Sequence, residues 1–487
     1  MNKLIKPSCI RRFIILFSAA FLAPVSSSQA EQQPNVLMIW VDDLRPEIAA
    51  YGVEAMHTPG LDRLAERSVR FDRAYCNISV CGASRASVMT GLRCTPTRFI
   101  DYDTWAERDA PEAVTLNEHF LKNGYHTAFY GKVFHFPEDS ANGWTEGKSF
   151  YEWPGYTEPE SKAIYEVRQA SGDWKNNGPA WELANVADNE LADGKIAEAA
   201  CQSIERLSKG SKPFFLATGF FKPHLPFVAP EEYWQHYQAR DMRLPDNFIR
   251  TCDAPEFAFS NWGELRSYAG MPETGSVSPE VAKQLIAAYR ACVSFTDAQI
   301  AKLLDTLEAS GEAENTIIVL LGDHGWNLGE HGMWCKHCCF ETSMRTPLMI
   351  SAPTLAGFKP GQATQSITEF TDIFPTLCEL SGLDTPTELV GQSAVGLLKD
   401  TSKSHREAAI GRFKIGDTIR TNRYRYTLFR DDNGKGQVIG EMLFDQQEDP
   451  AENNNLAKEP NMKQVISDLR TQLEASFSKA NVAKNAP

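Results

Sequence analysis

The chemistry available to this sequence centres on Cys81, which opens the stretch CGASRASVMTG, residues 81–91. We expect a helix to begin near Cys81, so that Arg85, one turn later, lies on the same face. A thiol that faces a helix N-terminus and a guanidinium group is in a setting that suits an anion-binding nucleophile. Ser84 and Ser87 are residue types that cap helices. The competing interpretation is a buried structural cysteine.

Acidic residues follow two apolar, β-rich segments. Asp42 and Asp43 end the run NVLMIWVDD, and Asp323 ends the run NTIIVLLGD. Three carboxylates from two strand ends would raise one another's pKa values strongly unless a cation lay between them. Oxygen ligands of this kind favour calcium or magnesium. His324, which follows Asp323, is the less usual member, since it would offer nitrogen to a cation that prefers oxygen.

The segments that position these residues alternate between strands and helices. This alternation predicts an α/β fold with a large, mostly parallel central sheet flanked by helices. The expected strands are residues 35–41, 126–131, 213–221, 315–323 and 347–353, and the expected helices are residues 59–69, 281–311 and 370–382.

In such a sheet, ligands bind beyond the carboxyl ends of the strands. Lys132 and His135 follow one expected strand, and Lys222 and His224 follow another. We therefore expect these four residues to meet the two acidic groups at one edge of the sheet.

The first thirty residues are expected to be a signal peptide, residues 1–30. Basic residues precede the apolar run FIILFSAAFLAPV, and Ser28-Gln29-Ala30 is a small-x-small cleavage site. The apolar run is shorter than the ~20 residues of a spanning helix. We expect a periplasmic or secreted protein that is not held in a membrane after cleavage.

Two further regions are expected after the leader. Residues 31–400 form the catalytic domain, and residues 401–487, with alternating strands and a terminal amphipathic helix, form a smaller C-terminal α+β subdomain. Residues 146–190, rich in Trp, Pro, Gly and Asn, are expected to be an irregular insertion. Long loops of this kind tend to be binding loops or lids.

The composition argues against nucleic-acid binding and leaves open whether the cysteines form disulfides or a zinc site. The net charge of −14 argues against nucleic-acid binding, which needs a basic face. Of the eleven cysteines, the ten beyond the leader could form disulfides in an oxidising compartment. A second group of cysteines and histidines has the ligand types of a structural zinc site, but the spacing of these residues along the sequence fits such a site poorly. It comprises His331, Cys335, His337, Cys338 and Cys339.

The motif at Cys81 resembles the signature of the type I sulfatases of the alkaline-phosphatase superfamily. That signature is Cys or Ser, any residue, Pro or Ala, any residue, and Arg, with Thr-Gly shortly after; here it is CGASR followed by Thr90-Gly91. The resemblance runs from NVLMIWVDDLRP to LFDQQEDPAENNNLA and is closest to the iduronate-2-sulfatases. It is carried by DDLRP, GYHTAFYGKVFH, FFKPHLPF and DHGWNLGEHGMWCKH.

The resemblance implies two cofactors. Cys81 would be oxidised to formylglycine, an aldehyde, by a separate maturation enzyme; Ala83 replaces the proline of many signatures, which leaves the kind of enzyme open. One Ca²⁺ per chain would be bound. Many sulfatases have Asn where His324 stands, and histidine is the form of the iduronate-2-sulfatase branch. The implied metal ligands are Asp42, Asp43, the modified Cys81, Asp323 and His324.

The resemblance also implies roles for the charged residues. One hydroxyl of the hydrated aldehyde would attack sulfur, and loss of a proton from the other would expel sulfate. Arg85 and Lys132 would hold the hydrate, and His135 would be the base that triggers its collapse. His224 and Lys336 would bind sulfate and protonate the leaving oxygen, with the division between them open.

We therefore expect an exported sulfatase that acts on a sulfated oligosaccharide, with a 2-O-sulfated uronic acid at a chain end as first choice. Trp326 and Trp105 are the aromatic residues expected to stack on the sugar. Two alternatives remain: a phosphodiesterase or phosphonate hydrolase of the same superfamily, and a carbohydrate-binding relative without catalysis. A binding relative would be expected to have lost some of these charged groups.

Overall fold

An eight-stranded sheet forms the centre of the protein. The structure, a computed structural model, describes residues 33–172, 177–250 and 252–482 together with Met1, so the expected signal peptide at residues 1–30 lies outside the described chain. The strands stand in the order β13 (Gln362–Thr364), β2 (Val69–Phe71), β12 (Leu348–Ser351), β9 (Thr316–Gly322), β1 (Asn35–Val41), β7 (Phe214–Phe220), β4 (His126–Gly131) and β5 (Glu146–Lys148).

The middle of this sheet is parallel and completely buried. Strands β1, β7 and β9 each have seven residues, and all of them are buried. Such continuous apolar strands are typical of sheets covered on both faces. Val41 lies opposite Phe220 of β7 and Gly322 of β9, so the residues that follow these three strands emerge at the same edge.

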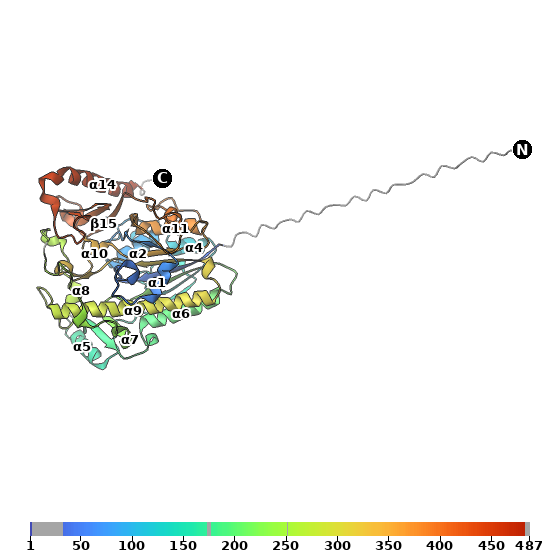
Figure 1. Cartoon of the computed structure of the whole chain (residues 1–487), viewed down its shortest axis with the longest axis horizontal. Coiled ribbons are helices and arrows are strands. Elements are labelled where there is room, and N and C mark those ends of the chain that lie inside the picture. The colour runs from blue at the N-terminus through green and yellow to red at the C-terminus, as the bar shows by residue number, and fades with distance from the viewer. Residues whose placement is uncertain (2–32, 173–176, 251, 483–487) are drawn as a thin grey trace. The chain divides into compact units, whose positions relative to one another are not determined.

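Helices cover both faces of the sheet. Alternate residues of β1 point to opposite sides: Leu37 and Ile39 belong to one core, and Val36 and Met38 to the other. The first core is closed by α1 (Pro59–Glu66), α6 (Ala192–Leu207) and α9 (Pro279–Ala309). The second is closed by α2 (Cys81–Thr90), α4 (Leu116–Lys122) and α11 (Ile373–Leu380), which lie on the opposite side of the sheet in Figure 1.

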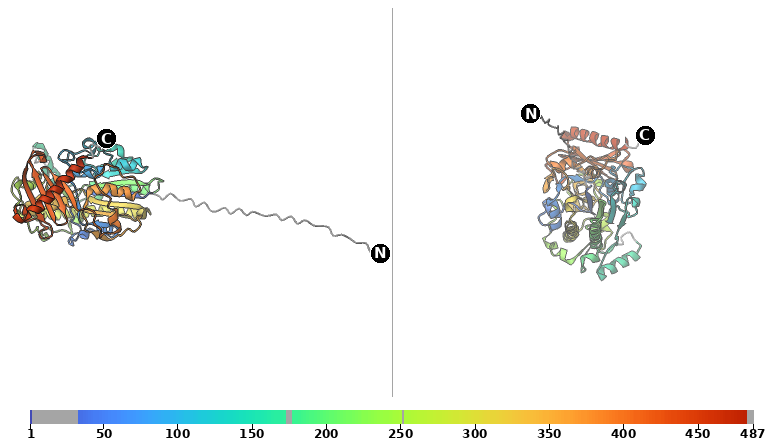
Figure 2. Two further views of the ribbon diagram at one scale, coloured as in Figure 1. Left: turned by 90° about the horizontal axis from the view of Figure 1, so that it is seen from above. Right: turned by 90° about the vertical axis from the view of Figure 1, so that its right-hand side faces the viewer.

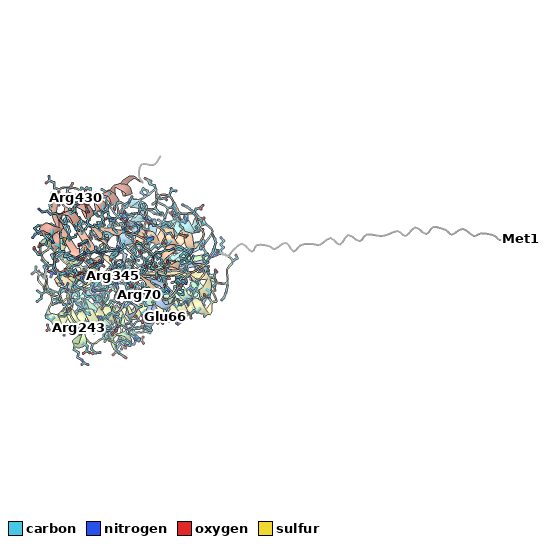
Figure 3. All side chains as sticks on the ribbon, turned by 45° about the horizontal axis from the view of Figure 1, so that its top comes forward. Met1, Glu66, Arg70, Arg243, Arg345 and Arg430 are labelled. Carbon is cyan, nitrogen blue, oxygen red and sulfur yellow. The ribbon has the colours of Figure 1, made fainter. Side chains whose placement is uncertain are left out.

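The C-terminal part is a four-stranded antiparallel sheet crossed by one long helix. The strands are β15 (Ala408–Phe413), β16 (Gly416–Thr421), β17 (Tyr424–Arg430) and β18 (Val438–Asp445). Figure 2 shows α14 (Lys463–Val482) lying across them, and Leu473 of this helix belongs to the same buried core as Tyr426 of β17. Arg430, labelled in Figure 3, pairs with Glu474 and so ties β17 to this helix. The predicted α/β class with a smaller C-terminal α+β subdomain is confirmed, and the boundary at residue 400 stays a prediction.

Residues 146–190 are more regular than predicted. They contain α5 (Pro159–Ala170) and β6 (Trp181–Ala184), which pairs in parallel with β8 (Phe227–Pro230). The prediction of an irregular insertion is therefore wrong for these parts. Ser161 is the one residue of α5 that is buried. The helix therefore lacks a buried apolar face, and the amphipathic pattern that predicts a helix from sequence is missing.

The remaining elements are short. They are β3 (Ala74–Tyr75), β10 (Asn327–Leu328), β11 (Trp334–Cys335), β14 (Thr368–Glu369), α3 (Ala106–Asp109), α7 (Glu231–Trp234), α8 (Gly263–Arg266), α10 (Glu341–Met344), α12 (Val395–Lys399) and α13 (Asp431–Gly434). None of the described helices combines the length and the apolar composition that a membrane span requires. All ten cysteines in the described residues are free thiols, so the disulfide alternative is wrong for them.

Candidate active site

The carboxyl ends of four neighbouring strands bring the predicted residues together. Asp42 directly follows β1, Asp323 follows β9, Lys132 follows β4, and His224 lies four residues beyond β7. The expectation that these distant segments meet at one edge of the sheet is therefore confirmed. Gly219, near the end of β7, lets the backbone of Lys132 approach β7 closely, because a Cβ atom at position 219 would collide with that backbone.

Helix α2 points its first residue, Cys81, at this edge. Cys81 Sγ lies 3.4 Å from His324 Nε2 and Arg85 Nε lies 3.0 Å from Asp323 Oδ2, so both side chains face the end of β9, as the one-turn spacing predicts. The two serines do not cap the helix: Ser84 Oγ donates to the carbonyl oxygen of Asp323 at 2.5 Å, and Ser87 Oγ donates to that of Leu92 at 2.6 Å. Ser84 thus binds the helix directly to the end of β9.

Four of the five predicted metal ligands form one buried group. Asp42, Cys81, Asp323 and His324 each offer a ligand atom, and these atoms lie within 4.8 Å of one another. His324 Nε2 lies 3.4 Å from Cys81 Sγ. Two carboxylates, an imidazole nitrogen and the side chain at position 81 around one point fit a single divalent cation.

The fifth predicted ligand, Asp43, borders this group. Its Oδ1 lies 3.5 Å from His324 Nε2, and its backbone N–H donates to Asp323 Oδ1 at 3.0 Å. Asp43 has a positive φ of 61°, a conformation that turns its carboxylate toward the site. Burial raises the pKa of Asp43 to about 7, although Lys336 opposes this shift from 3.0 Å.

Two buried cations hold the carboxylates on the other side. Arg85 Nε lies 3.0 Å from Asp323 Oδ2, and its Nη2 lies 3.3 Å from Asp42 Oδ1. Lys132 Nζ donates to Asp42 Oδ2 at 2.6 Å. Burial alone would raise the pKa of Asp42, but Lys132 and Arg85 hold it well below its ordinary value. Asp42 is therefore ionised and available as a ligand.

Glu264 is a site residue that the sequence did not reveal. This residue of α8 lies 3.0 Å from His224 Nε2 and 3.0 Å from Lys336 Nζ, so it bridges two residues with predicted roles. No recognisable motif surrounds Glu264, and in the sequence α8 lies far from the ends of all the predicted strands.

Two further titratable residues at the site are Cys81 and His135. Burial, reinforced by Asp42, raises the pKa of the Cys81 thiol to about 12, so an unmodified thiol would be a poor nucleophile at neutral pH. Burial and the nearby Lys132 lower the pKa of His135 to about 3. Among the described residues its Nδ1 has no hydrogen-bond partner. His135 is thus a neutral imidazole.

A cavity of about 810 Å³ opens beside these groups. Asp42, Lys132, His135 and His224 line it, together with Ser149 and residues 151–157. Two aromatic side chains of that segment are solvent-exposed: Tyr151 by 61% and Trp153 by 39%. The Trp153 ring lies 5.7 Å from the His224 ring. The sequence pointed to residues 146–190 as a binding loop but not to these two residues.

The aromatic residues that the sequence did select lie elsewhere. Trp326 is 1% exposed and packs between Tyr289, at 6.4 Å, and Lys336, whose Nζ lies 4.9 Å from the ring. It cannot stack on a sugar, so its prediction as a substrate-binding residue is wrong. Trp105 is half-buried and stacks at 4.8 Å on Phe136, which lines the cavity in its place.

The zinc alternative finds no support within the described chain, where two groups of side chains could hold an ion. One is the group of four around Cys81, and the other comprises Asp43, His224 and Glu264. His331 instead bonds through Nε2 to the carbonyl oxygen of Ala451 at 3.0 Å.

Comparison with known proteins agrees with this site. Residues 34–383 match the sulfatase family, and residues 329–479 match the family described as N-sulphoglucosamine sulphohydrolase, C-terminal. Iduronate 2-sulfatase of Mus musculus is 32% identical over 403 residues, which cover 76% of this chain and 72% of the relative. The likeness extends through most of both chains.

Solved structures share the fold. A 2-O GAG sulfatase is 24% identical with a TM-score of 0.72 and covers 92% of this chain and 93% of its own. A phosphonate monoester hydrolase from Silicibacter pomeroyi is 21% identical with a TM-score of 0.73 and covers 92% and 96%. At these identities the two structures bear on the fold alone, whereas the family match spans most of the chain. The chain therefore belongs to the sulfatase family and is a sulfuric ester hydrolase.

Proposed function

We propose that this sulfatase removes sulfate from a sugar residue at the end of a glycan chain, with a 2-O-sulfated uronic acid as its preferred substrate. The observation that carries the proposal is the position of Cys81. Its side chain belongs to the buried ligand group, and Asp42 of that group lines an 810 Å³ cavity together with Lys132. A relative that covers most of the chain is named iduronate 2-sulfatase, which supports a uronate substrate.

The residues at the site fit the two groups that the family implies. Asp42, Asp323 and His324 would hold a Ca²⁺ ion together with the side chain at position 81, and Asp43 stands at their edge. A formylglycine at position 81 and a bound cation would supply a hydroxyl nucleophile and positive charge for the sulfonyl oxygens.

The chain's own residues prepare the site for this reaction. Arg85 and Lys132 keep the carboxylates of Asp42 and Asp323 in place. His135 is neutral and accepts a proton on the nucleophile side. His224 and Lys336 are hydrogen-bond donors on the side proposed for the leaving group, and an alkoxide leaving group requires such a donor.

The cavity suits a sugar. Tyr151 and Trp153 offer exposed aromatic faces, and Lys162 on α5 offers a cation at the cavity wall for a uronate carboxylate. A cavity with these linings favours a chain end over the interior of a polymer, which supports exo-action.

Two further parts of the proposal rest on the sequence. The leader at residues 1–30 supports export to the periplasm or the medium. The signature around Cys81 supports a maturation enzyme as a partner, since the thiol must be oxidised before the protein is active.

A substrate panel tests the proposal. The protein is produced together with a formylglycine-generating enzyme and assayed on defined oligosaccharides that differ only in sulfate position and in uronate content. We expect the highest kcat/KM on terminal 2-O-sulfated uronates. Faster hydrolysis of 6-O-sulfated hexosamines, with none of 2-O-sulfated uronates, would contradict the substrate. Activity on a phosphate diester without activity on an aryl sulfate would instead favour the phosphonate hydrolase alternative.

A further inference from the structure

Glu264 joins the two cations on the leaving-group side. Its carboxylate lies 3.0 Å from His224 Nε2, and it lies 3.1 Å and 3.0 Å from Lys336 Nζ through Oε1 and Oε2. Lys336 is 2% exposed and also contacts Asp43. His224 is farther from Asp43, at 3.9 Å, so Glu264 is its closest charged partner among the described residues.

The hydrogen bonds of His224 define which of its nitrogens carry a proton. Nδ1 lies 2.6 Å from the carbonyl oxygen of Leu225, and a carbonyl oxygen can only accept, so Nδ1 donates. Nε2 lies 3.0 Å from a carboxylate oxygen of Glu264. An ionised carboxylate can also only accept. Both nitrogens therefore face acceptors, which is the hydrogen-bond pattern of a doubly protonated imidazole, and the two contacts fix the orientation of the ring.

Glu264 is held firmly in place. Its neighbours Trp262 and Leu265 are 3% and 1% exposed, and Arg266 donates to the carbonyl oxygens of Pro272 at 2.7 Å and Gly275 at 2.8 Å. Trp262 has a left-handed φ of 40°, a conformation that the surrounding contacts must maintain. The carboxylate is thus presented by a fixed turn and not by a loose loop.

The cavity distinguishes His224 from Lys336. Within the described chain, the residues that line it include His224 but neither Lys336 nor Glu264. Of these three residues, His224 is therefore the one that a substrate in the cavity meets, and Glu264 lies beside its Nε2.

We propose, on the basis of the sulfatase function above, that Glu264 is a positioning residue that holds His224 as the proton donor to the leaving oxygen. As the bond between sulfur and the sugar oxygen breaks, its electron pair stays on that oxygen. The oxygen takes the proton from Nε2 of His224 and leaves as the alcohol. An alkoxide is a far stronger base than a carboxylate, so the proton moves to the sugar oxygen and not to Glu264. The imidazole is then neutral and regains a proton from water.

The nature of the leaving group separates this role from a structural one. A sugar alkoxide is a poor leaving group and needs the proton, whereas a nitrophenolate leaves readily without it. Loss of a merely structural carboxylate would slow both kinds of substrate equally.

The experiment compares Glu264→Gln with the unchanged enzyme on a sulfated monosaccharide and on 4-nitrophenyl sulfate. We expect kcat on the sugar to fall by about 100-fold, with less than about a threefold change on the aryl ester. His224→Gln should show the same selectivity, and the double variant should lose little more than either single variant. Glu256→Gln is the matched control, since Glu256 lies in the same segment and pairs at the surface with Arg250 at 2.6 Å.

Equal losses on both substrates, or no loss on the sugar, would overturn the proposal. If Glu264→Gln does not fold, as judged by its thermal melt, Glu264→Asp takes its place; the side chain is one methylene shorter, and the same selective loss is expected. An unchanged enzyme that hydrolyses neither sulfate ester would refute the proposed function, which is a separate result from an active enzyme whose variants lack selectivity.

Discussion

Arg85 Nε and Asp323 Oδ2 lie 3.0 Å apart with neither side chain exposed to solvent, and this pair joins the middle of α2 to the end of β9. Removing one partner of a buried ion pair leaves an uncompensated charge. We expect Arg85→Ala to lower the free energy of unfolding by about 3 kcal/mol, measured by urea denaturation. Arg108→Ala, which removes an exposed pair with Asp109, should cost less than about 1 kcal/mol.

Cys81→Ala should fold normally and lack turnover. The side chain is small and buried, and the proposed nucleophile derives from it. We expect a far-UV circular dichroism spectrum like that of the unchanged protein and no sulfate release. In the active protein, the peptide that spans Cys81 should have the lower mass of the aldehyde and react with carbonyl reagents. Full activity with an unmodified thiol would contradict the proposed role of position 81.

Chelation of the divalent cation should abolish activity, and calcium should restore it. Asp323→Asn removes a carboxylate ligand from the group around Cys81, and we expect kcat/KM to fall by about 100-fold or more. Loss of a residue that only hydrogen-bonds to a metal ligand already lowers activity by up to about 100-fold. Calorimetric titration of the metal-free protein with Ca²⁺ measures the lost affinity directly. Undiminished rates after thorough chelation would show that the site needs no ion.

Trp153→Ala should weaken the binding of oligosaccharides. The ring is 39% exposed at the cavity wall, and an aromatic contact contributes about 1 kcal/mol. We expect KM for an oligosaccharide to rise by about fivefold, while kcat and the rate on a small aryl sulfate stay unchanged. Val167→Ala on the exposed face of α5 is the control. An unchanged KM would place the sugar elsewhere.

Asp297 should make the stability of the protein depend on pH. It accepts hydrogen bonds from the backbone N–H groups of Gly60 at 3.0 Å and Leu61 at 2.6 Å, and burial raises its pKa from 3.8 to about 7. Between these two values the folded state binds more protons than the unfolded state. The free energy of unfolding therefore falls as pH rises through this window, by up to ~1.4 kcal/mol per pH unit from this group.

Asp297→Asn removes this contribution, so the slope of stability against pH between 3.8 and about 7 should become smaller. Denaturant unfolding at a series of pH values measures it. Asp305→Asn is the control, because Asp305 is 63% exposed and pairs only at the surface with Arg63. Equal slopes in the two variants would contradict the assignment to Asp297.

Much of the site was determined by the sequence, because its signals are local. Cys81 and Arg85 share a helix face because they are one turn apart, and Asp42 and Asp323 meet because each ends a strand in the same parallel sheet. The continuous apolar segments that precede Asp42 and Asp323 predict buried strands from the sequence alone.

The substrate side was decided only by the tertiary structure. Trp326 and Trp153 are both aromatic residues in glycine-rich surroundings, and packing alone makes the first a core residue at 1% exposure and the second an exposed one at 39%. Glu264 has no motif, since its role comes from meeting His224 and Lys336, each at least 40 residues away. Contacts between such distant residues depend on how loops close over the sheet, and no periodicity in the chain encodes that closure.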